Sequence, residues 1–89
     1  MYCESDSGYT TFYCSDGKKH MASKSLKEFE AQLTQHSFIR PHQSFMVHLK
    51  FIDKYEKAGV IHLKNGIKIP VSSRKKELVV STFLNWNKG

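Results

Sequence analysis

The stretch VIHLKNGIKIPV, residues 60–71, decides the fold class of this chain. Two apolar-rich runs flank Asn65-Gly66, a dipeptide that accepts the positive φ of a type I′ hairpin turn. With two turn residues, Lys64 faces Ile67 across the hairpin. Apolar residues then fall on both faces: Val60, Ile67, Ile69 and Val71 on one, Ile61 and Leu63 on the other. The pattern predicts an antiparallel hairpin covered on both faces by a second sheet or a helix.

Four further segments upstream are predicted to be extended. Residues 9–13 are rich in β-branched and aromatic side chains, and Asp16-Gly17 supplies a turn before residues 19–22, which indicates another hairpin. Residues 38–42 alternate roughly in polarity and contain a proline, which favours a strand at a sheet edge. Residues 45–47 follow as a short apolar run, with a bend expected from His48 to Lys50.

One helix is predicted between these hairpins and another at the C-terminus. Ser25 and Glu28 have capping-box spacing, and an apolar stripe follows at Leu26, Phe29 and Leu33. After the second hairpin, Ser72-Ser73 can cap a terminal helix whose apolar side carries Val79, Phe83 and Trp86.

Three cations, Arg74, Lys75 and Lys76, fall in the first turn of that terminal helix. Each is unfavourable at the positive end of a helix dipole, by a few tenths of a kcal/mol. A bound anion makes the energy of these cations favourable, and phosphates commonly bind at helix N-termini. The cluster therefore indicates a phosphate contact, with a solvated helix start as the alternative.

The composition favours a small binding domain with an anionic partner. Eighty-nine residues allow one domain with a modest core and leave no room for a large cofactor cavity. The net charge is +6, and residues 31–89 hold ten basic residues against three acidic ones. We therefore expect the partner surface to lie mainly in the C-terminal two-thirds, with no cofactor and no enzymatic activity.

Several other classes find no support in the sequence. The longest apolar runs are far shorter than the roughly 20 residues of a membrane span, and no secretory signal begins the chain, so we expect a cytoplasmic protein without membrane contact. Cys3 and Cys14 match no zinc or redox spacing and are expected to be reduced. The five histidines show no usual ligand spacing with a cysteine, so no metal site is expected.

The central motif resembles the LytTR DNA-binding domain. Residues 38–47, FIRPHQSFMV, match the F-x-R-x-H-x-S-(aromatic)-x-V element of that family. Ile52, the Asn65-Gly66 hairpin and the Pro-Val-Ser step at residues 70–72 continue the match. It extends back through the predicted helix to Tyr2, so the resemblance covers nearly the whole chain.

The resemblance implies a mostly β fold of small stacked antiparallel sheets with one or two short helices. It also implies sequence-specific binding of double-stranded DNA by a bacterial transcription regulator, most often a two-component response regulator. Residues 1–89 would be a single domain, the C-terminal part of a longer chain with a receiver or sensor domain, lacking the family's first strand or two. Two protomers would bind direct repeats in a promoter as a homodimer.

Carried over one at a time, family positions give candidate DNA contacts. Arg74 is expected to read a guanine through O6 and N7 in the major groove. Tyr9 or Thr10, in a loop before the first hairpin, and His48, where the family usually has asparagine, would make further groove contacts. The remaining candidates are the neighbouring polar and basic residues Arg40, His42, Lys50, Ser73, Lys75 and Lys76.

Two alternatives stay open at this point. Arg40 and His42 could brace their strand instead of contacting phosphate. The basic surface could also belong to a protein-interaction module that binds an acidic partner without preference among DNA sequences. An RNA-binding platform is less favoured, because Phe12 and Tyr13 are adjacent on a strand and face opposite sides.

Overall fold

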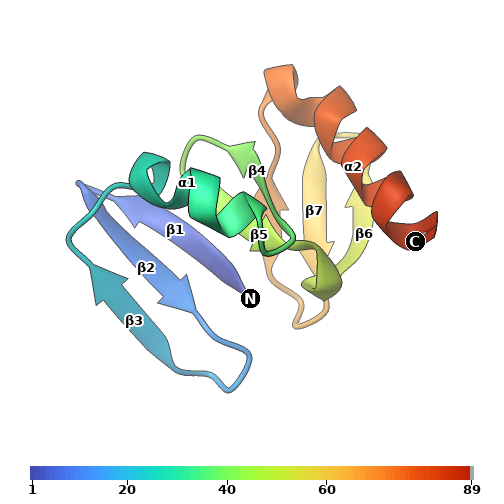
Figure 1. Ribbon diagram of the computed structural model, residues 1–89. Helices are drawn as coiled ribbons and strands as arrows, with labels where there is room; N and C mark the ends of the chain where they lie inside the picture. Colours follow the sequence, from blue (N-terminus) through green and yellow to red (C-terminus); the bar gives the residue numbers. More distant parts are fainter. Residues whose placement is uncertain (89) are drawn as a thin grey trace.

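The computed structural model describes residues 1–88, in which strands predominate (Figure 1). The strands are β1 (Tyr2–Asp6), β2 (Tyr9–Tyr13), β3 (Lys19–Ala22), β4 (Phe38–His42), β5 (Phe45–His48), β6 (Ile52–Glu56), β7 (Val60–Leu63) and β8 (Lys68–Pro70). The helices are α1 (Leu26–Thr34) and α2 (Lys76–Lys88), and the 3₁₀ turns are η1 (Leu49–Phe51) and η2 (Ser73–Lys75).

The strands form two antiparallel sheets. One has the order β3-β2-β1-β5-β4 and the other the order β6-β7-β8. The predicted fold class, mostly β with small antiparallel sheets and two helices, is confirmed. The segment 38–42, predicted to lie at a sheet edge, is the edge strand β4, and a register shift between Ile39 and His42 accommodates Pro41.

The five-stranded sheet is buried on both faces where its central strands β1 and β5 pair. Tyr2 and Val47 are cross-strand partners and belong to the larger core, which also holds residues of the three-stranded sheet and Val79 of α2. Cys3 and Met46, the next partners along, point to the opposite face, where they pack with Leu26 of α1. The sheet is therefore the middle layer, with α1 on one side and the second sheet with α2 on the other.

The helix α1 begins as predicted. Glu28 Oε2 accepts the Ser25 main-chain N–H at 2.9 Å, which completes a capping box. Leu26 is buried in the smaller core, and Leu33 packs against it. The local signals were sufficient here because capping and apolar spacing agree.

The hairpin β7–β8 forms, but the predicted register is wrong by one residue. His62 pairs with Lys68 and Ile61 with Ile69, so the loop has three residues instead of two. Gly66 N–H donates to the carbonyl of Leu63 at 2.9 Å, and only Gly66 in this loop has a positive φ, which excludes a type I′ turn. The shift places Ile61, Leu63 and Ile69 together in the core, so the predicted assignment of Ile61 and Leu63 to the face opposite Ile69 is also wrong.

The N-terminal hairpin β2–β3 is confirmed, but β1 and β6 were not predicted. β1 joins β2 through the two-residue turn Ser7-Gly8, where both residues have positive φ as a type I′ turn requires. The predicted bend after residue 47 begins later, because β5 continues through His48 and η1 follows it.

The C-terminal helix starts through a 3₁₀ turn. Ser72 precedes η2, and its side chain makes no capping hydrogen bond, contrary to the prediction. Val79 is buried and Phe83 packs against the core, whereas Trp86 is 40 % exposed, so the predicted apolar side is covered less completely toward its C-terminal end.

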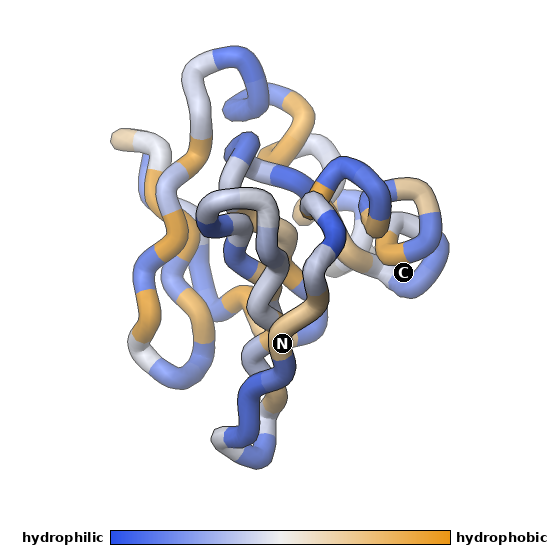
Figure 2. The backbone as a smooth tube through the Cα atoms, turned by 90° about the vertical axis from the view of Figure 1, so that its left-hand side faces the viewer, coloured by the Kyte–Doolittle hydropathy of each residue, from blue (hydrophilic) through white to orange (hydrophobic). Residues whose placement is uncertain are grey.

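Hydrophobic and hydrophilic residues alternate along much of the chain (Figure 2). Within residues 1–88, no helix combines the length and the apolar character that a membrane crossing requires.

Candidate nucleic-acid interface

Arg74 lies in the turn η2, between β8 and α2. Two main-chain hydrogen bonds hold the start of this turn: Ser72 N–H donates to the Pro41 carbonyl at 2.9 Å, and Lys75 N–H donates to the Ser72 carbonyl at 2.9 Å. The Arg74 side chain is exposed and forms no ion pair within residues 1–88. The structure thus presents a solvent-accessible guanidinium on an anchored turn.

A hollow of about 430 Å³ lies beside this turn. Its lining residues come from α1, β4, the β4–β5 turn and the segment around η2: Glu30, Arg40, His42, Gln43, Ser72, Arg74 and Lys75. Three of these side chains are cationic and only Glu30 is acidic. The hollow therefore carries an excess of positive charge.

The three consecutive cations do not form one cluster. Arg74 and Lys75 line the hollow, whereas Lys76 lines a different groove with Tyr55 of β6. The aliphatic chain of Lys76 also covers Gly59, where an added Cβ would lie only 2.9 Å from Lys76 Cε. Lys76 is thus directed away from the surface that Arg74 and Lys75 share.

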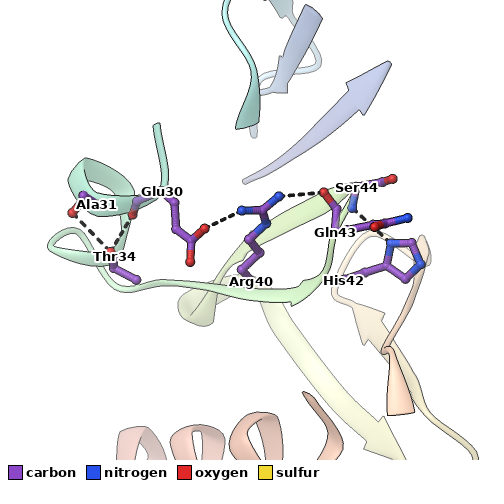
Figure 3. A network of polar contacts seen from close by, with 7 residues as sticks. All are labelled: Glu30, Ala31, Thr34, Arg40, His42, Gln43 and Ser44. Atoms are coloured by element: carbon purple, nitrogen blue, oxygen red, sulfur yellow. Dashed lines mark hydrogen bonds and ion pairs between the residues drawn. The ribbon is translucent and has the colours of Figure 1, made fainter. Parts of the chain in front are cut away.

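Arg40 is engaged by groups within the chain (Figure 3). Its Nη1 forms an ion pair with Glu30 Oε1, and its Nη2 donates to the Gln43 carbonyl at 2.9 Å. Its Nε is buried without a hydrogen-bond partner among the described residues. In the domain without DNA, these contacts make Arg40 a brace of β4 and its turn.

His42 shapes the same turn. The Ser44 main-chain N–H donates to His42 Nδ1 at 3.1 Å (Figure 3). The imidazole packs edge-on against Phe45, with ring centroids 5.8 Å apart. An acceptor at Nδ1 leaves the proton of the neutral ring on Nε2. His42 therefore combines a structural contact with one hydrogen-bond donor at the hollow.

His48 is packed among aromatic rings. Its centroid lies 5.0 Å from that of Phe38, 5.7 Å from that of Phe51 and 6.4 Å from that of Trp86. Its Nδ1 accepts the Lys50 main-chain N–H at 3.0 Å. Burial, with the positive charges of the amino terminus and Lys50, lowers the pKa of His48, so the neutral ring is favoured.

Tyr9 and Thr10 belong to β2, not to a loop. Thr10 is fully buried, and its hydroxyl donates to the Lys24 carbonyl at 2.8 Å. Its side chain is therefore not available to a base, and the expectation of a groove contact there is corrected. Tyr9 is 49 % exposed and directly follows the Ser7-Gly8 turn.

Main-chain contacts show which candidates lie together. Ser5 N–H donates to the Ser44 carbonyl at 2.8 Å, and Ser72 N–H donates to Pro41. The β1–β2 hairpin and η2 therefore flank the β4–β5 turn. This end gathers Tyr9, Arg40, His42, Ser73, Arg74 and Lys75, whereas His48 and Lys50 lie at the other end of β5.

Two residues at the hollow were missed by the sequence analysis. Glu30 lies ten positions before Arg40, and Gln43 contributes its main-chain carbonyl, so neither pairing has a local sequence signal. Across residues 1–88, no three His, Cys, Asp or Glu side chains are arranged to hold a metal ion.

The chain is similar to known DNA-binding domains in sequence and in structure. Residues 1–83 match the LytTr DNA-binding domain family. A solved structure, the LytTr DNA-binding domain of a protein described as a putative methyl-accepting/DNA response regulator from Bacillus cereus, superposes with a TM-score of 0.79 at 29 % identity. The match covers 92 % of this chain and 78 % of that one. No curated protein sequence matches the chain.

These findings define the chain first as a small β domain of the DNA-binding class. It belongs to the LytTR DNA-binding domain family, as the match over nearly its whole length shows. That family binds DNA and is not a family of enzymes. The resemblance noted in the motif at residues 38–47 is thereby confirmed.

Proposed function

We propose that this domain binds double-stranded DNA sequence-specifically and acts as the effector domain of a bacterial transcription regulator. The observation that carries the proposal is Arg74, an exposed guanidinium without an ion pair to any of residues 1–88, on a turn tied to β4. Arginine recognises guanine through paired donors to O6 and N7. A turn held by main-chain hydrogen bonds lowers the entropic cost of placing that fork.

The other candidate residues make different kinds of contact with the duplex. Lys75 and Ser73 hold the phosphate backbone beside Arg74, and Tyr9 meets the duplex from the neighbouring hairpin. Lys50, exposed at the other end of β5, binds a more distant phosphate. His48 is half-buried, so its contribution is to position the Lys50 main chain more than to contact a base.

The proposed biological setting is a two-component response regulator in the cytoplasm. A receiver or sensor domain would lie elsewhere in a longer chain, with residues 1–89 as its single DNA-binding domain. Two protomers would bind adjacent direct repeats in a promoter as a homodimer. The similar Bacillus cereus domain comes from a protein described as a response regulator, which supports this setting.

Selection from a random DNA pool tests the proposal. The purified domain selects duplexes, and its affinity for the winner and for a scrambled control is then measured across a salt series. We expect a repeated motif, tighter binding of the winner, and a log–log salt slope of about −4 to −6, as about five or six neutralised phosphates give.

Equal affinity for the winner and the scrambled duplex would contradict base reading. The basic surface would then be an electrostatic patch, as expected of a module that binds an acidic protein.

A further inference from the structure

The hollow beside Arg74 contains one residue whose charge opposes DNA binding. Glu30 projects from α1, and its carboxylate contacts Arg40 (Figure 3). Arg40, Arg74 and Lys75 line a common space beside it. A second, smaller hollow of about 290 Å³ between α1, β4 and α2 is also lined by Glu30, Arg40 and Lys75. Glu30 therefore lies where the two hollows meet, at the proposed interface.

The contact between Glu30 and Arg40 is made through one atom on each side. Only Nη1 of Arg40 meets Oε1 of Glu30, while Nη2 is directed to the Gln43 carbonyl. Paired, fork-like contacts are the strong arrangement for arginine and a carboxylate, and this pair lacks the second one. Side chains of Arg40 and Glu30 are 19 % and 38 % exposed, so solvent reaches both. The pair is thus open to exchange with another anion.

The charges around the hollow favour an anion larger than one carboxylate. Three cations and one acid leave an excess of two positive charges, and His42 and Ser72 add neutral hydrogen-bond donors. A volume of about 430 Å³ is also many times the ~30 Å³ that a water molecule occupies in the liquid. A tetrahedral phosphate group has the charge and the acceptor oxygens that these donors match.

We propose that Glu30 limits the affinity of the domain for DNA, because its carboxylate occupies Arg40 at the place where a backbone phosphate binds. In the DNA complex, the phosphate takes the position beside Lys75, and Arg40 turns from Glu30 toward it. The inference rests on the proposed DNA interface at this end of the domain. It concerns a phosphate and therefore does not depend on base reading by Arg74.

Neutralising Glu30 provides the test. Glu30→Gln keeps the size of the side chain and removes the charge, so Arg40 becomes available to DNA. Gaining about one phosphate contact steepens the log–log salt slope by about 0.9 and tightens binding about fivefold at 0.15 M salt. The gain is expected on the selected and the scrambled duplex alike.

Three further variants distinguish an effect of the Glu30–Arg40 pair from an effect of net charge. Asp53→Asn removes the same charge from an exposed residue of β6 and should leave the slope unchanged. Glu30→Asp retains the charge but withdraws the carboxylate by one methylene, so it should give part of the gain. Arg40→Gln combined with Glu30→Gln should abolish the gain in DNA affinity, because Arg40 makes the additional phosphate contact. Thermal unfolding of each variant confirms that it is folded.

Two results would overturn the proposal. In one, Glu30→Gln and Asp53→Asn tighten binding equally, so that only net charge matters. In the other, the double variant keeps the whole gain, so that Arg40 plays no part. A separate outcome is that the wild-type domain shows no sequence preference. This result refutes base reading, and the effect of Glu30 on affinity can still be measured on any duplex.

Discussion

Two candidate side chains of the site have hydrogen-bond or ion-pair partners that the sequence does not indicate. Thr10 is one of the two residues that the family resemblance predicts for a groove contact, yet it is buried and donates to the Lys24 carbonyl. From the sequence alone Arg40 has no evident partner, yet it forms an ion pair with Glu30 of α1. Both partners are distant in sequence, so no spacing rule indicates them. Arg74, by contrast, follows a strand and precedes a helix, and its exposure could be predicted from that position.

The buried hydroxyl of Thr10 leads to a stability prediction. Thr10→Val keeps the shape but leaves the Lys24 carbonyl without this donor, so the free energy of unfolding should fall by about 1–2 kcal/mol. Thr10→Ser retains the hydroxyl and is the control. Urea denaturation measures both, and DNA affinity of the folded Val variant should be unchanged. If Thr10→Val kept full stability but bound DNA more weakly, Thr10 would instead be a DNA contact.

His48 predicts how stability depends on pH. Its pKa is lowered in the folded state, so the unfolded chain binds the proton more readily, with a pKa of about 6.5. Stability is therefore complete above that pH and decreases as the pH falls through it. His48→Asn can still accept the Lys50 N–H but does not titrate, so its unfolding free energy should decline less between pH 7 and pH 5. Equal declines, measured by urea denaturation, would exclude this effect of His48.

Helices and hairpins were predictable where one local signal dominates. The capping box and apolar stripe of α1 agree, and α1 forms as expected. The β7–β8 hairpin was also predicted, but the Asn65-Gly66 dipeptide fits two loop lengths, and burial of Ile61 with Ile69 selects the three-residue loop. β1 and β6 carry no strong alternation; β1 is determined by its pairing with the distant strand β5, and β6 by its pairing with the neighbouring strand β7. Tertiary contacts thus decided what local patterns left open.

Gly66 is the residue on which the three-residue loop depends. Its φ is 90°, in the region that costs other residues about 1–2 kcal/mol. Gly66→Ala should therefore lower the free energy of unfolding by about that amount, whereas Lys64→Ala, exposed in the same loop, should have little effect. Chemical denaturation compares the two. Equal stability of both variants would show that the loop has no left-handed residue at this position.

The whole molecule brings the site together from separate segments. The five-stranded sheet holds the β1–β2 hairpin and the β4–β5 turn side by side, and the Ser72–Pro41 hydrogen bond adds η2 to this end. The family, the basic character and the candidate Arg74 could be predicted from the sequence alone. The division of the cations could not, because the separation of Lys76 from Lys75 depends on how α2 lies against Gly59 and β6.

The most direct test of base reading by Arg74 compares Arg74→Ala with Arg74→Lys on the selected and scrambled duplexes. We predict that Arg74→Ala loses about 1–3 kcal/mol on the selected duplex and relaxes preference at one base pair, with a much smaller loss on the scrambled one. Arg74→Lys keeps the charge but not the fork, so it should restore general affinity more than preference. Equal weakening on both duplexes by Arg74→Ala would contradict base reading and leave Arg74 as a phosphate contact only.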